Sequence, residues 1–137
     1  MPMTNDEVDR YLAEKLMGWI VEPNRITEIT IITLIFNRVP HYFNEDKIVM
    51  QVEHWQPTCN ISQALGNGGP ETVVGEMKAL GWDFCYISLP REETSQFYCS
   101  FEKGIRSSIE KTGPRYHASA DCSAEAISRA AVAALMV

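Results

Sequence analysis

Residues 115–135 constrain the fold most, because they predict a short strand followed by a helix that is apolar on nearly every side. A polar cap is expected at Asp121 or Ser123. One face of the helix has the i, i+3, i+4, i+7, i+8 spacing of apolar residues, at Ile127, Ala130, Ala131, Ala134 and Leu135. On the opposite side, Arg129 stands among further small apolar residues. Such a helix is normally covered on more than one side. We expect the protein's own sheet as one cover, and a second subunit or a ligand is a candidate for the other.

The bulk properties indicate one globular domain over residues 1–137, long enough to bury its own core. The formal net charge of −6 argues against binding to polymeric nucleic acid, which needs a basic face. No run approaches the roughly 18–20 apolar residues of a membrane span, and the first residues do not resemble a signal peptide. The cysteines have no C-x-x-C spacing, which favours free thiols. We therefore expect a cytoplasmic protein without membrane contact.

Patterns along the rest of the chain predict an α+β fold. Helices are expected at residues 5–17 and at residues 60–80, the second interrupted by the Gly-rich segment 66–70. Strands are expected at residues 26–36, 47–55, 82–89, 96–102 and 115–120. The first two strands could pair as a hairpin. This order indicates a small, mainly antiparallel sheet of about five strands packed with about three helices, an α-β-α sandwich-like arrangement.

No motif for catalysis or metal binding appears in the sequence. His41, His54 and His117 lie outside any recognisable nucleophile, metal or acid–base motif, and the Gly-rich segment lacks the Lys-Ser/Thr of a P-loop. We therefore predict a protein that is not an enzyme, with no catalytic residue, no metal site and no cofactor. A small hydrolase acting on nucleotides is a further alternative.

Residues 103–117 form a basic segment, which contains a single carboxylate, at Glu110. Its four cationic residues are Lys103, Arg106, Lys111 and Arg115. One interpretation is a loop that holds phosphate through charge-assisted hydrogen bonds from arginine. The other is a solvated loop whose charges keep the protein soluble. Phe101, at the end of the strand that enters this segment, is the aromatic residue best placed to stack on a ligand base.

Arg129 is the remaining candidate for anion binding. Glu125 precedes it by four residues, in the favourable order for a helical ion pair. The apolar surroundings would also strengthen its attraction to a ligand anion, because water is partly excluded there. The sequence leaves both interpretations open.

Several short pieces resemble, in order, the small phage and prophage proteins of the phage α-β-α sandwich family. They cover the larger part of the chain and comprise the first helix running into LMGW (residues 16–19), WQP (55–57) leading to SQA (62–64), MKALGW (77–82), YCSF (98–101) and, above all, AEAISRAAVAAL (124–135). Residues 25–53 have no counterpart in the family, and the Gly-rich segment interrupts what is usually one helix.

The family includes the first type of Thoeris anti-defence protein. These proteins bind cyclic ADP-ribose isomers, made by bacterial TIR enzymes, at sites between subunits without cleaving them, and some hexamers also hold cyclic trinucleotides. The resemblance implies a cytoplasmic homo-oligomer, a dimer or hexamer, that sequesters a cyclic nucleotide immune signal in the bacterial host cell. Phe101 would then stack on the base, and Arg106, Arg115 and Arg129 would hold phosphates. The alternative is a phage-derived structural or protein-interaction module with no small ligand, which would use the Ala-rich helix as its interface.

Overall fold

The computed structural model describes residues 3–21, 41–45, 47–66, 69, 71–91, 94–103 and 115–136, and all structural statements below concern these residues. The strand expected at residues 26–36 lies outside them, as does Arg106. The elements in chain order are α1 (Asn5–Lys15), β1 (Ile20–Val21), β2 (His41–Asn44), β3 (Lys47–Gln51), the 3-10 helix η1 (Val52–His54), α3 (Ile61–Ala64), α4 (Val73–Ala79), β4 (Asp83–Arg91), β5 (Thr94–Glu102), β6 (Arg115–Ala120) and α5 (Ser123–Leu135).

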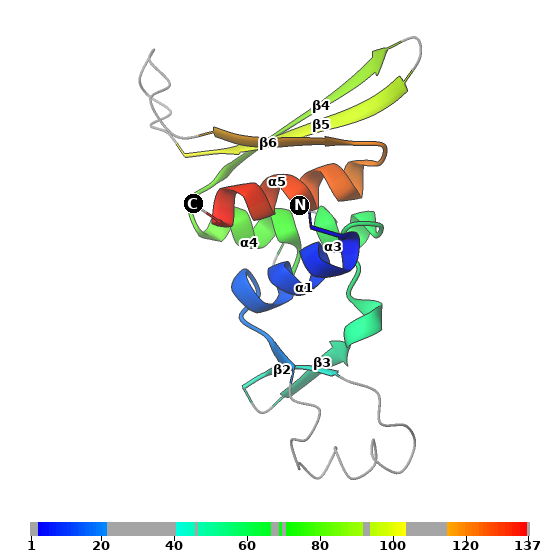
Figure 1. Cartoon of the computed structure of the whole chain (residues 1–137). Coiled ribbons are helices and arrows are strands. Elements are labelled where there is room, and N and C mark those ends of the chain that lie inside the picture. Colours follow the sequence, from blue (N-terminus) through cyan, green and yellow to red (C-terminus); the bar gives the residue numbers. More distant parts are fainter. Residues whose placement is uncertain are drawn as a thin grey trace.

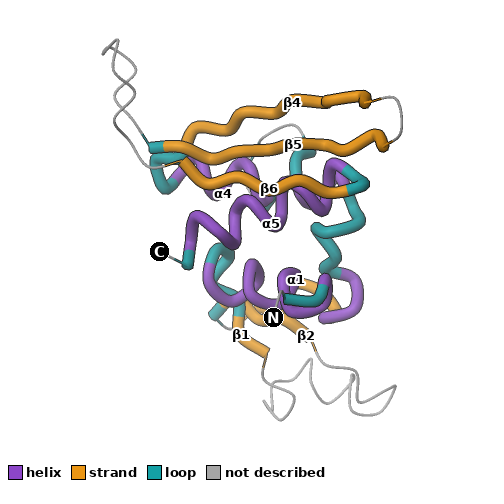
Figure 2. Tube along the Cα trace, turned by 45° about the horizontal axis from the view of Figure 1, so that its top comes forward, coloured by secondary structure: helices purple, strands orange, loops and turns teal. Residues whose placement is uncertain are grey.

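Helix α5 is the element on which most of the others pack. The sheet β4-β5-β6 covers one side of it, and α1, α3 and α4 lie against the rest of its circumference (Figures 1 and 2). Small side chains such as Ala126 and Ala130 are fully buried and let these neighbours approach closely. The second cover of this helix is therefore the protein's own helices, and the expectation of a second subunit or ligand in that place was wrong.

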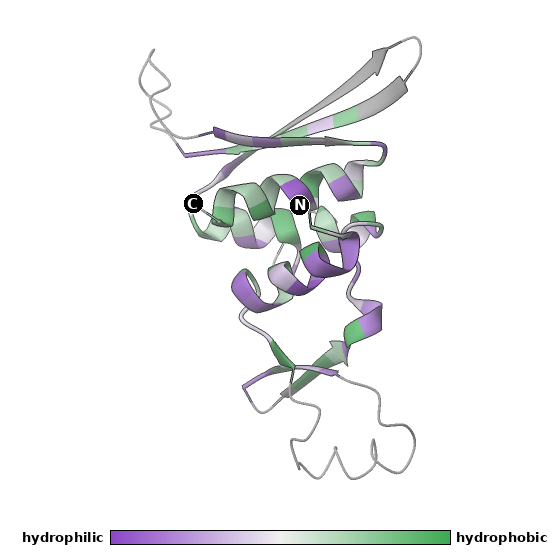
Figure 3. Cartoon of the chain, viewed as in Figure 1, coloured by the Kyte–Doolittle hydropathy of each residue, from purple (hydrophilic) through white to green (hydrophobic). Residues whose placement is uncertain are grey.

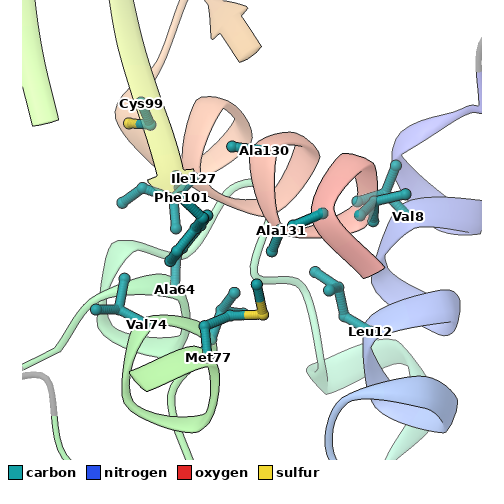
Figure 4. Close-up of a cluster of buried hydrophobic side chains, with 14 of the residues drawn as sticks. Val8, Leu12, Ala64, Val74, Met77, Cys99, Phe101, Ile127, Ala130 and Ala131 are labelled. Carbon is teal, nitrogen blue, oxygen red and sulfur yellow. The ribbon is translucent and has the colours of Figure 1, made fainter. Parts of the chain in front are cut away.

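The sheet that contacts α5 is antiparallel, in the order β4-β5-β6. Its register aligns Phe84 with Phe101 and Phe101 with Tyr116, so these three rings share the face turned towards α5. Figure 4 shows Phe101 beside Ile127 of α5 and above Ala64 and Val74 of α3 and α4. The other face carries more polar side chains, among them His117. In the described part of the chain, helices cover only one face of this sheet (Figure 1).

A second antiparallel sheet, in the order β1-β2-β3, lies on the opposite side of the helices. It joins α1 through an aromatic cluster in which the Trp19 ring centroid lies 4.9 Å from that of Trp55 and 5.8 Å from that of Tyr42. The indole Nε1 of Trp55 donates a hydrogen bond of 2.8 Å to the backbone carbonyl of Asp9. Aromatic packing and this hydrogen bond attach the small sheet to α1.

The α+β class predicted from the sequence is confirmed, but a single sheet of about five strands is not. The strands form two sheets of three, because α1 and α5 separate β1-β2-β3 from β4-β5-β6 and keep their edges far beyond hydrogen-bonding distance. Strand β2 was not predicted; it pairs with β3 through a turn in which Glu45 has a φ of 56°. Among the described residues, helices lie on only one face of β4-β5-β6, so this sheet does not form the centre of an α-β-α sandwich there.

The helix boundaries follow capping residues that are visible in the sequence. The Thr4 side chain accepts a hydrogen bond of 3.2 Å from the Glu7 amide at the start of α1, and Asn60 and Thr72 cap α3 and α4 in the same way. Cys122, and neither Asp121 nor Ser123, is the N-cap residue of α5, without a side-chain hydrogen bond. Figure 3 shows α5 hydrophobic along most of its length, whereas α1 carries many hydrophilic residues. None of the helices described is both long enough and apolar enough to cross a membrane.

The interruption predicted at the Gly-rich segment is confirmed, since α3 and α4 are separate helices. Gly69 lies so close to α4 that a Cβ atom at Gly75, within that helix, would collide with the Gly69 carbonyl oxygen. Gly66 has a φ of 50°, in the left-handed region that favours glycine. The lack of a side chain at Gly75 thus allows the Gly69 backbone to lie directly against α4.

Candidate functional site

Arg129 uses its guanidinium to tie α5 to the N-terminal residues. Its Nε donates a hydrogen bond of 3.3 Å to Glu125, Nη1 donates one of 2.9 Å to the Met3 carbonyl, and Nη2 donates one of 2.8 Å to Asn5 Oδ1. The ion pair with Glu125 that the sequence suggested is therefore present, together with two partners that the sequence did not suggest. All three nitrogen atoms are engaged in a link between α5 and the start of α1.

Phe101 is not placed to stack on a ligand. The residue is 0% exposed, and its ring centroid lies 5.3 Å from that of Phe84 inside the core (Figure 4). The expectation that Phe101 offers its face to a base does not fit this position. The prediction that Phe101 lies near the end of a strand is confirmed, but its side chain points to α5.

Arg115 lies at the end of the sheet, where the basic segment 103–117 rejoins the fold. Its Nε is 3.1 Å from the Glu102 carboxylate, and the side chain is 48% exposed. Glu102 and Arg115 are register partners on β5 and β6, so Lys103, the next residue after Glu102, leaves the sheet at the same end. Both ends of the basic segment therefore meet at one end of the sheet.

Trp82 connects this end of the sheet to a cavity. The Lys103 Nζ atom lies 4.7 Å from the centroid of the Trp82 ring, a cation–π distance, and the Tyr116 ring meets Trp82 edge-on with centroids 5.7 Å apart. The adjoining cavity has a volume of about 380 Å³ and is lined by Lys78, Gly81, Trp82, Asp83 and Phe84. This volume falls in the range of small-molecule pockets.

Two positive charges and one negative charge lie around the Trp82 cavity, and the positive excess favours an anionic ligand. Lys78 lines it and Lys103 lies over its indole wall, and neither ammonium group has a carboxylate partner among the described residues. Asp83 lines the same cavity and moderates the positive charge. An ammonium group that no carboxylate neutralises can bind a phosphate without first breaking an ion pair.

The predicted site residues are only partly brought together. Arg115 lies at the same end of the sheet as Lys103 and Trp82, Phe101 is in the core, and Arg129 faces α1 on the other side of α5. Arg106 lies outside the described residues. The sequence patterns did not single out Lys78 and did not favour a ligand role for Trp82; the signal available was the junction of a helix and a strand at Gly81, which brings their side chains to one end of the sheet.

No group of three or more metal-ligating side chains converges in the part of the chain that the structure describes. Comparison with known proteins gives no match: no protein-family model, curated protein or solved structure matches the chain.

Proposed function

We propose that this protein binds a small phosphorylated nucleotide at the Trp82 cavity and, as a phage anti-defence protein, sequesters a cyclic nucleotide immune signal without cleaving it. The observation that carries the proposal is the pair of ammonium groups, Lys78 and Lys103, that adjoin an aromatic-walled cavity of about 380 Å³ without carboxylate partners among the described residues. The family resemblance of the sequence points to the same class of ligand.

In this proposal the phosphates lie between Lys78 and Lys103, and Trp82 takes the stacking role first expected for Phe101. Trp82 is only 7% exposed, and Lys103 lies over its face. A phosphate would draw the Lys103 ammonium away, because a charge-assisted hydrogen bond is stronger than an exposed cation–π contact. The freed indole face would then contact the base. Arg115, half-exposed beside Glu102, can turn towards the same phosphates.

Ligand recovery tests the proposal directly. The purified protein is mixed with cyclic ADP-ribose isomers, cyclic dinucleotides and cyclic trinucleotides, separated from free ligand, and then heated to denature it. We expect one ligand to be released intact, as identified by mass spectrometry. Recovery of an altered ligand would show an enzyme, and retention of none of these ligands would overturn the proposal.

Two charge variants locate the site. Lys78→Gln and Lys103→Gln should each weaken binding by about tenfold, the expected loss of one charge-assisted hydrogen bond. Lys15→Gln is the matched control, because Lys15 belongs to the last turn of α1, away from the Trp82 cavity. Equal affinities for all three variants would place the ligand elsewhere.

The second candidate function is a protein-interaction module, and the outer face of the sheet β4-β5-β6 favours it. Helices cover only the opposite face in the described part of the chain (Figure 1). On this outer face, Tyr98 of β5 stacks on His117 of β6 with ring centroids 5.3 Å apart. We assign the proposed homo-oligomer contact to this face, because α5 is already covered by its own chain.

A further inference from the structure

A second cavity, of about 360 Å³, lies between α1, β2 and η1. It is far in the fold from the Trp82 cavity, since α1 and the sheet β4-β5-β6 contact opposite sides of α5 (Figure 2). The residues that line it and matter here are Asp6, Asp9, Arg10, Tyr42, Glu53 and Trp55. Three carboxylates therefore face one guanidinium. The Arg10 Nε is 3.7 Å from Glu14, so its charge is partly taken by a carboxylate that does not line the cavity.

Asp9 is held in place in this cavity by Thr58, and no cationic side chain among the described residues contacts it directly. It is 5% exposed, its Oδ1 accepts a hydrogen bond of 2.9 Å from the Thr58 amide, and its Oδ2 accepts one of 3.0 Å from the Thr58 hydroxyl. Burial raises the pKa of Asp9 from 3.8 to about 6 against the lowering effect of these bonds; the charge of Asp6 raises it further and that of Arg129 lowers it. A buried carboxylate of this kind is stabilised by any cation that reaches it.

Tyr42 adds an unsatisfied polar group to the same cavity. It is 1% exposed, and its phenol has no hydrogen-bond partner among the described residues. Among the described residues, the side-chain polar atoms that are both buried from solvent and without a hydrogen-bond partner are the hydroxyl oxygens of Ser100 and Ser128. The Tyr42 hydroxyl is not among these sealed atoms, so it opens to the cavity that Tyr42 lines. A phenol oxygen can accept a hydrogen bond from a ligand N–H group.

From this juxtaposition of Asp9, Tyr42 and the flanking carboxylates Asp6 and Glu53, we infer that the cavity binds a small organic cation with an ammonium or guanidinium group. The aromatic rings of Trp55 and Tyr42 line the cavity and suit such a group, because the π face of an aromatic ring attracts a cation. The described residues contain no metal-ligating cluster, and the cavity is much larger than a bare ion needs. The inference does not depend on the proposed nucleotide site.

Calorimetric titration tests the inference, with agmatine, putrescine and guanidinium chloride as cations and 1-butanol as an uncharged probe, at pH 8 and low salt. We expect at least one cation to bind with a Kd in the millimolar range or tighter, and no binding of the alcohol. Asp9→Asn should weaken cation binding at least about tenfold, since it removes the buried charge while the amide can still bond to Thr58. Tyr42→Phe should weaken it less, by a few-fold, because it removes one neutral acceptor.

Glu76→Gln is the charge-matched control, because Glu76 lies on α4 and lines neither cavity. It should bind the cation as the unmodified protein does. Cation affinity should also rise from pH 5 to pH 7, as Asp9 loses its proton; Asp6, Glu53, Arg10 and Arg129 are the other charged groups around it. Absence of binding to every cation, or equal affinity in Asp9→Asn and Glu76→Gln, would overturn the inference. Either result would leave the nucleotide proposal standing.

Discussion

At the scale of single residues, Asp9 shows how burial and hydrogen bonding oppose each other at one carboxylate. Two hydrogen bonds from Thr58 favour the ionised form, but the loss of hydration is the larger effect, and the pKa rises to about 6. The folded protein therefore holds this proton more tightly than the unfolded chain does. The contribution of the protonated Asp9 side chain to the free energy of unfolding is fully present below about pH 4. It is lost as the pH rises through about 6.

This linkage gives a stability prediction. Between pH 3 and pH 7, the free energy of unfolding of the unmodified protein should fall by about 3 kcal/mol relative to that of Asp9→Asn, which cannot ionise. Urea denaturation at several pH values measures both proteins. Taking the difference between the two curves cancels the other carboxylates, which titrate in both. Parallel curves, or a difference that grows in the opposite direction, would contradict the raised pKa.

The candidate site could be predicted from the sequence only where its residues are neighbours in the chain. The Glu125–Arg129 pair is visible as an i, i+4 spacing, whereas Met3 and Asn5, the other partners of Arg129, are more than a hundred positions away. For Phe101, the alternation of β5 places it on an apolar face but does not say that α5 covers that face. The link between Lys103 and Trp82 crosses from β5 to the start of β4, which no local pattern reveals.

At the scale of elements, local patterns predicted most boundaries and failed on pairing. Helix α1, the hairpin of β4 and β5, strand β6 and helix α5 match their expected segments. The short strand β2 was missed because it has only four residues and depends on β3 for its hydrogen bonds. Which strands share a sheet was decided by the helices between them, and that information is not local.

Arg129 joins two of these elements, and its replacement should show a structural role. Arg129→Met removes hydrogen bonds to Glu125, Met3 and Asn5 and leaves a half-buried carbonyl at Met3 without its donor. We expect the free energy of unfolding to fall by about 2 kcal/mol, measured by urea denaturation. Nucleotide binding per folded molecule should not change.

Arg10→Met provides the comparison on the surface of α1. Arg10 makes one exposed ion pair with Glu14, which contributes about 0.5 kcal/mol or less. If Arg129→Met and Arg10→Met destabilised the protein equally, the link between α5 and the N-terminal residues would contribute nothing. If Arg129→Met instead kept full stability and lost the nucleotide, the ligand role first considered for Arg129 would be restored.

At the scale of the whole molecule, the sheet β4-β5-β6 has one face inside the fold and one face that the described helices leave open. On the open face, the exposed His117 of the edge strand β6 lies next to Tyr98 of the central strand β5. A contact between copies through this face would bury the two rings. The same contact could not form through α5, whose small residues are already occupied by the sheet and by α1, α3 and α4.

The proposed assembly can be checked with one surface charge. We expect light scattering coupled to size-exclusion chromatography to give an oligomer for the unmodified protein at tens of micromolar. His117→Glu should shift it towards the monomer, because a negative charge would be buried between copies of a chain that is already acidic. Lys15→Glu, which changes charge on α1, is the control and should stay oligomeric. A monomeric unmodified protein would exclude this contact.

The central position of α5 also has a consequence for synthesis on the ribosome. Every element that packs on this helix precedes it in the chain, so the nascent protein carries the inner face of the sheet and the apolar sides of α1 and α4 before their common partner has been translated. Those surfaces are exposed until α5 leaves the exit tunnel, and exposed apolar surfaces recruit chaperones or aggregate. Folding of these elements is thus delayed until α5 has been synthesised, and a stalled or shortened chain that lacks α5 is expected to be a substrate for proteolysis and not a partly folded protein.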